Sequence, residues 1–164
     1  MAKEHSMDIT IQFDFQELKN AVEQTKKEAV NRFDLKDANV EIELSEDNIK
    51  ITAQSEMQID SIHGILIKKM ISRSVSPLVL KREPAKEIGG MRMREEMKLI
   101  KALDQENGKK IANIIRESFP KSKPNIQGDT VRVTSQSIDE LQQIIATLRA
   151  DEKLALPLEF GNYR

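Results

Sequence analysis

The sequence predicts an α+β protein made of two tandem βαββαβ units, each an antiparallel sheet with helices on one face. Segments with apolar residues at every second position alternate with segments that have them at three- and four-residue spacing, which indicates strands and helices. The order strand-helix-strand-strand-helix-strand then occurs twice, in residues 1–88 and again in residues 89–164. Because helices cover one face of each sheet, the opposite polar face is open to a ligand.

The first repeat contains each element of this order. Asp14 precedes a helical segment that continues to Phe33, and the next helix is expected between Ile59 and Met70. Apolar residues alternate with polar ones in the segments expected to be strands. These strands cover residues 9–13, 40–44, 49–54 and 78–80.

The second repeat follows a connector expected at 83–90, which contains Pro84 and two glycines. A strand over 91–99 places Met91 and Met93 in the core. A helix then runs up to Pro120, and Gly128-Asp129 predicts the turn of a hairpin. The next helix begins after Ser137, with Glu140 completing a capping box, and a last strand covers 157–162.

Composition excludes several classes of protein. The 164 residues include no cysteine, so disulfides, thiolate metal sites and cysteine nucleophiles are ruled out. No apolar run is long enough to cross a membrane, and the first residues lack a signal-peptide core, so we expect a cytoplasmic protein. The net charge is −1, but residues 81–123 carry 12 Lys and Arg against 7 Asp and Glu. This basic middle indicates either an anionic partner or simply a solvated surface.

Several short motifs together resemble the YajQ-like family along nearly the whole chain. They are Asn31-Arg32-Phe33-Asp34-Leu35, Ile126-Gln127-Gly128-Asp129 with Val131-Arg132-Val133-Thr134, Asp139-Glu140-Leu141-Gln142 and the ending Phe160-Gly161-Asn162-Tyr163-Arg164. The resemblance implies a duplicated ferredoxin-like fold, with the exchange of first strands between the two sheets left open. It also implies a non-catalytic protein that binds nucleotides or RNA, with some members acting as cyclic di-GMP effectors through protein partners. Many relatives have basic residues where this chain has Gln136 and Ile138, which weakens the case for a phosphate site at that loop.

The candidate nucleotide-binding residues are mainly basic side chains of the second repeat. If the methionines of 91–99 face the core, then Arg92, Arg94 and Lys98 face away from it, and Arg132 is expected on the same surface. Arginine presents a planar fork of donors that matches phosphate oxygens. The alternative is that neighbouring carboxylates pair with these cations as ordinary cross-strand pairs; they are Glu95, Glu96 and Asp129.

Two further candidates follow the first helix. Arg32 and Phe33 could offer a guanidinium and a stacking surface to a base, although Phe33 also fits as the last core residue of its helix. The histidines suggest no active site, because His5 is expected in a frayed tail and His63 on an exposed helix surface. We therefore expect no enzyme activity, no metal site and no cofactor.

Three functions remain open at this point. The first is binding of a nucleotide or cyclic dinucleotide that signals to a macromolecule such as a transcription regulator. The second is a protein-interaction adaptor without a physiological nucleotide, and the third is weak, salt-dependent RNA binding. Stacking of bases on central strands is not expected, since residues 49–52 and 130–134 contain no aromatic side chain.

Overall fold

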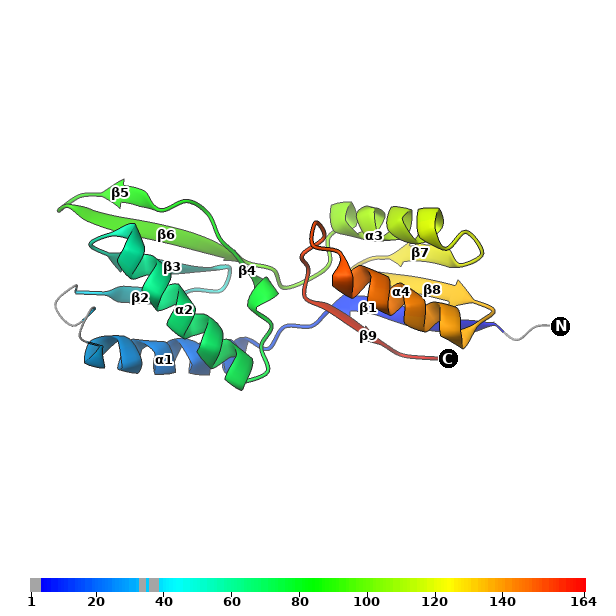
Figure 1. Cartoon of the computed structure of the whole chain (residues 1–164), viewed down its shortest axis with the longest axis horizontal. Helices are drawn as coiled ribbons and strands as arrows, with labels where there is room; N and C mark the ends of the chain where they lie inside the picture. Colours follow the sequence, from blue (N-terminus) through cyan, green and yellow to red (C-terminus); the bar gives the residue numbers. More distant parts are fainter. Residues whose placement is uncertain (1–3, 33–34, 36–38) are drawn as a thin grey trace. The chain divides into compact units, whose positions relative to one another are not determined.

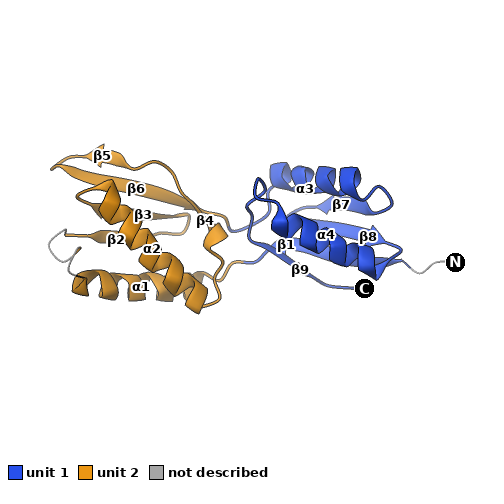
Figure 2. Cartoon of the chain, viewed as in Figure 1, with its two compact units in different colours: residues 1–12, 101–164 blue, residues 13–100 orange. Residues whose placement is uncertain are grey.

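The computed structural model describes residues 4–32, 35 and 39–164, which form two compact units. Unit 1 comprises Met1–Gln12 with Lys101–Arg164, and unit 2 comprises Phe13–Ile100 (Figure 2). These units do not coincide with the two sequence repeats, whose boundary lies at residues 88/89. The reason is that each repeat contributes its first strand to the sheet of the other, so the exchanged topology is the one that the chain adopts.

The described part of unit 2 consists of one antiparallel sheet, two long helices and a 3-10 turn (Figure 1). The helices are α1 (Phe15–Asn31) and α2 (Glu56–Ser72), and a 3-10 turn spans Pro77–Val79. The strands are β2 (Glu41–Leu44), β3 (Asn48–Ala53), β4 (Leu80–Lys81), β5 (Lys86–Ile88) and β6 (Arg92–Leu99). The strand order is β2-β3-β6-β4, and β5 also pairs with β6.

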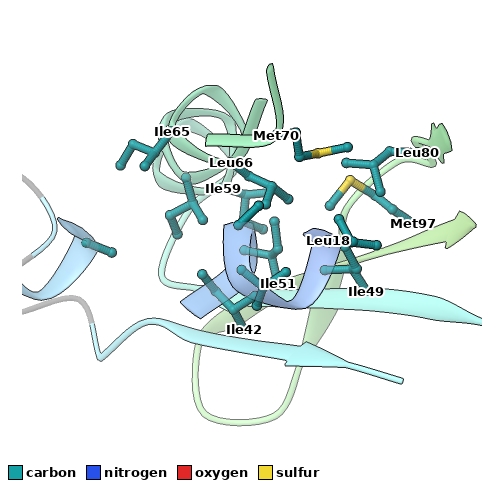
Figure 3. Packing of buried hydrophobic residues seen from close by; sticks show 14 of the residues in the cluster. Leu18, Ile42, Ile49, Ile51, Ile59, Ile65, Leu66, Met70, Leu80 and Met97 are labelled. Atoms are coloured by element: carbon teal, nitrogen blue, oxygen red, sulfur yellow. The ribbon is translucent and has the colours of Figure 1, made fainter. Parts of the chain in front are cut away.

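One face of this sheet packs against α1 and α2 to form the core of unit 2. Leu18 of α1 and Ile59 and Leu66 of α2 are almost fully buried, together with Ile51 of β3 and Met97 of β6 (Figure 3). Burying an aliphatic side chain of this size contributes about 1.5–3 kcal/mol before entropy is counted. The side chains at alternate positions of β3 and β6 therefore point to the face that neither of the described helices of unit 2 covers.

Unit 1 contains a second sheet with its own helical layer (Figure 1). Its elements are β1 (His5–Ile11), α3 (Gln105–Ser118), β7 (Lys123–Gln127), β8 (Thr130–Ser135), α4 (Ile138–Ala150) and β9 (Leu158–Gly161). The strand order is β7-β8-β1-β9, with β1 antiparallel to both of its neighbours. Met7 and Ile9 of β1 are fully buried, as are Val131 and Val133 of β8. The predicted hairpin at Gly128-Asp129 is confirmed, since β7 and β8 pair on either side of it.

Helix capping follows the sequence closely. Asp14, Ser55, Asp104 and Ser137 are the N-caps of α1, α2, α3 and α4, and the side chain of each accepts a hydrogen bond from a backbone N–H of the first turn. The capping box at Ser137 is only half formed. The Glu140 carboxylate instead accepts a hydrogen bond from the Ser122 hydroxyl at 2.6 Å.

Several local expectations were wrong. The short strand expected at 78–80 is shifted along the chain: Pro77–Val79 form the 3-10 turn, and β4 covers Leu80–Lys81. The expected connector at 83–90 contains β5, which pairs with β6. Met91 is 95% exposed because it lies in the turn before β6, with a left-handed φ of 59°. His5 begins β1 and so is not in a frayed tail, while His63 is partly buried. None of the described helices is long and apolar enough to cross a membrane.

Candidate nucleotide-binding surface

Strand β6 has a basic side as well as a buried side. Met93, Met97 and Leu99 pack against the core of unit 2, and Glu95 between them is also buried. Since side chains alternate along a strand, those of Arg92, Arg94, Glu96 and Lys98 point to the opposite face of the sheet. We call this face the open face of unit 2; it also contains Thr52 and Lys50 of β3, Lys86 of β5 and the carboxylates of Glu41 and Glu43 of β2. The structure thus brings together three of the predicted cations.

Arg94 is the cation on the open face best prepared for an anion. Its Nε donates a hydrogen bond to Oγ1 of Thr52 at 3.0 Å, which holds the side chain over β3. Among the described residues no carboxylate forms an ion pair with Arg94, so its terminal nitrogens can still donate to a ligand. Lys86 lies directly opposite Arg94 in the pairing of β5 with β6. Two cations side by side, one of them with a free fork of donors, favour a phosphate.

The other two cations of β6 have partners of different kinds. The guanidinium of Arg92 donates a hydrogen bond to the backbone carbonyl of Asn39, and no carboxylate of the described residues forms an ion pair with it. Lys98 lies 3.5 Å from a carboxylate oxygen of Glu83, but its side chain is 64% exposed, so the pair is weak. Glu96 accepts a hydrogen bond from the side-chain amide of Asn48. The open face is therefore most basic at the Arg92 end of β6.

Arg132 does not lie on this surface. It belongs to β8 in unit 1, because the exchange of first strands places β6 in the other sheet. Its guanidinium donates two hydrogen bonds to the carboxylate of Asp8, at 2.9 and 3.3 Å, and the side-chain amide of Asn162 donates a third at 2.7 Å. The hydrogen bonds from Arg132 lower the pKa of Asp8, and burial opposes this effect. The charge of Arg132 is thus already compensated within the protein.

The remaining two candidates follow α1. Arg32 is the C-cap residue of that helix and is exposed. Phe33 lies outside the described residues, so its predicted stacking role stays a prediction. Sequence reasoning missed Lys86 and Thr52, since neither stands in a recognisable motif. Only the pairing of β5 and β3 with β6 brings them next to Arg94.

A second charged cluster lies on the helix-covered side of the same strand. Glu95 is 3% exposed and accepts two hydrogen bonds from Arg82, at 2.7 and 2.9 Å, while Arg82 also binds Asp60 at 2.7 Å. The hydrogen bonds that Arg82 donates to Glu95 raise the pKa of Arg82, so that guanidinium stays charged. Burial, and then the charge of Arg82, lowers the pKa of His63. This cluster faces away from the basic side of β6 and is a structural ion pair rather than part of the anion surface.

The fold and this surface define a two-unit α+β protein with a basic sheet face. A family model described as "Nucleotide-binding protein YajQ-like" matches residues 5–164. Relatives named "Nucleotide-binding protein" include those of Trichodesmium erythraeum at 42% identity over 164 residues, Chloroflexus aggregans at 44% over 165 and Roseiflexus sp. at 41% over 165. Each alignment covers 100% of both chains. The chain therefore belongs to the YajQ-like family.

Proposed function

We propose that this protein binds a nucleotide, either a nucleoside triphosphate or a cyclic dinucleotide such as cyclic di-GMP, through its phosphates on the open face of unit 2. The relatives' names support nucleotide binding in general. The observation that supports this location is Arg94, held by a neutral hydroxyl instead of a carboxylate, between Arg92 and Lys86. The role is binding without catalysis, with the signal passed to a macromolecular partner.

The chemistry of the site favours recognition of phosphate over a purely structural role. An arginine that serves only the sheet would be expected to pair with a carboxylate, as Arg132 and Arg82 do. A charge-assisted hydrogen bond contributes about 1.5–3 kcal/mol, so one arginine lost from a phosphate contact weakens binding about tenfold or more. Lys98, farther along β6, adds to the positive potential that attracts the ligand.

Calorimetric titration with GTP, ATP and cyclic di-GMP tests this function. We expect one of them to bind the wild-type chain and the variant Arg92→Ala with Arg94→Ala to lose at least tenfold in affinity. The matched control removes the same charge from α3 by Lys109→Ala with Arg116→Ala, both of which are exposed. Equal affinity in both double variants would refute the location.

Two alternatives give different results in the same experiment. If none of the three nucleotides binds at low salt, the protein is better explained as a protein-interaction adaptor. A short single-stranded RNA should bind no more tightly than the preferred nucleotide. Tight RNA binding that falls steeply between low and physiological salt would favour an RNA-binding protein, because neutralised phosphates release counterions.

A further inference from the structure

Unit 2 contains a cavity of about 490 Å³ between the last turns of α1 and the edge strand β2. Its apolar wall includes Ala29 and Val30 from α1 with Val40 and Ile42 from the β2 side. The polar and charged residues of the lining are Lys26, Asn39, Glu41 and Glu43. Small-molecule sites typically have volumes of about 300–1,000 Å³, with mostly apolar walls and a few polar groups that fix orientation. The cavity therefore has the size and lining of a ligand site.

Asn39 connects this cavity with the basic surface. It lines the cavity, and its backbone carbonyl accepts the hydrogen bond from Arg92. The strand β2 stands at the edge of the sheet, and no described strand of unit 2 pairs with its outer side. A ligand can thus pass from the cavity around this edge to the open face without crossing a strand.

The lining suits a purine base. A base has two apolar faces and an edge of hydrogen-bonding groups, so it needs flat apolar walls and a few polar partners at one side. Ala29 and Val40 can contact the faces, while the side-chain amide of Asn39, which can both donate and accept, can pair with groups at the edge of the base. Val30 is 71% exposed and lies at the rim, where a bound base would cover its side chain.

We propose that this cavity holds the purine base of the nucleotide whose phosphates bind Arg92 and Arg94. This inference rests on the proposed function and adds to it a base site of named residues. It assigns the two halves of the ligand to opposite sides of the β2 edge, with Asn39 between them. Affinity for the base and affinity for the phosphates should then be separable by mutation.

The test compares a nucleotide with its phosphate part alone. Titrations use GTP, ATP and cyclic di-GMP as nucleotides, and tripolyphosphate as a probe without a base. The variant Ala29→Leu fills the cavity from α1, and Val30→Trp places a large side chain at its rim. The controls are Ala146→Leu on α4 and Met57→Trp on α2, both at exposed helical positions outside the cavity. Because Ala29 is buried, urea unfolding checks that Ala29→Leu still folds; Val30 is largely exposed and gives the second, independent variant.

We expect both cavity variants to lower the affinity for the preferred nucleotide at least tenfold and to keep the affinity for tripolyphosphate within twofold of wild type. The control variants should change neither affinity. Arg94→Gln should lower the affinity for both the nucleotide and tripolyphosphate. If nucleotide and tripolyphosphate bind equally well and neither cavity variant has an effect, the base site is refuted while the phosphate site stands. If the wild-type chain binds none of the nucleotides and no tripolyphosphate, the proposed function and the base site both fail.

Discussion

Removing the arginine that compensates Glu95 should destabilise unit 2 strongly. Glu95 is 3% exposed, and its carboxylate accepts two hydrogen bonds from Arg82. Breaking a buried ion pair by deleting one partner typically costs about 3–5 kcal/mol, because the remaining charge stays buried without a partner. The Arg82 side chain is 38% exposed, so water reaches the site and the lower end of this range applies. We therefore predict a loss of about 3 kcal/mol for Arg82→Ala.

Urea and thermal unfolding followed by circular dichroism measure this loss. For a unit of this size, about 3 kcal/mol corresponds to a decrease of roughly 15 °C in Tm. The control is Lys69→Ala, which removes a partly exposed pair with Glu28 at 3.3 Å and should cost less than about 1 kcal/mol. Replacing both partners, by Arg82→Met with Glu95→Leu, should recover most of the stability. A loss for Arg82→Ala no larger than that of the control would refute this reasoning.

Three further changes test other parts of the structure. Because Arg132 lowers the pKa of Asp8, ionised Asp8 stabilises the fold above its unfolded pKa of about 3.9, and this contribution disappears as the pH falls through the lower folded value. In the Asp8→Asn variant, the urea midpoint of unfolding should depend less on pH over that acid range. A pH dependence equal to that of the wild-type chain would contradict this prediction. Gly128→Ala should lower the free energy of unfolding by about 1 kcal/mol, since Gly128 has a φ of 63°, whereas Gly64→Ala inside α2 should stabilise the protein slightly. An added methyl group meets open space at both sites, so equal effects of the two variants would exclude backbone strain as the cause. Asp14→Ala should cost about 1 kcal/mol through loss of the N-cap of α1, measured by thermal unfolding, and no change would show that this cap is dispensable.

The order of elements was predictable because each long helix and strand carries its own periodicity. The strands β3 and β8 alternate cleanly, and capping residues such as Asp14 and Ser137 mark where helices begin. The short strand β5 was not predictable from the sequence. Its three residues, Lys86–Ile88, are too few to show an alternating pattern, and they form a strand only because they pair with β6. Local patterns reveal elements that are several residues long and miss those that depend on a neighbour.

The candidate site was predictable only in part, for a related reason. That Arg92 and Arg94 lie on one face follows from alternation within a single strand. Which sheet contains that strand depends on long-range pairing, and the same alternating pattern fits either sheet. Arg132 was therefore grouped with Arg92 although its partner is Asp8, 124 residues away in the sequence. The cavity beside Val30 likewise arises from packing between α1 and β2, for which no sequence motif exists.

The most direct test of the central claim is to titrate a ¹⁵N-labelled chain with the nucleotide that binds most tightly among GTP, ATP and cyclic di-GMP, and to follow the backbone amide signals. The phosphate site predicts saturable shifts on β5 and β6 around Lys86, Arg92 and Arg94, and on β3 around Thr52, and these shifts should be lost in the Arg92→Ala, Arg94→Ala variant. Shifts confined to unit 1, around Asp8 and Arg132, or shifts that persist in that variant, would contradict the account.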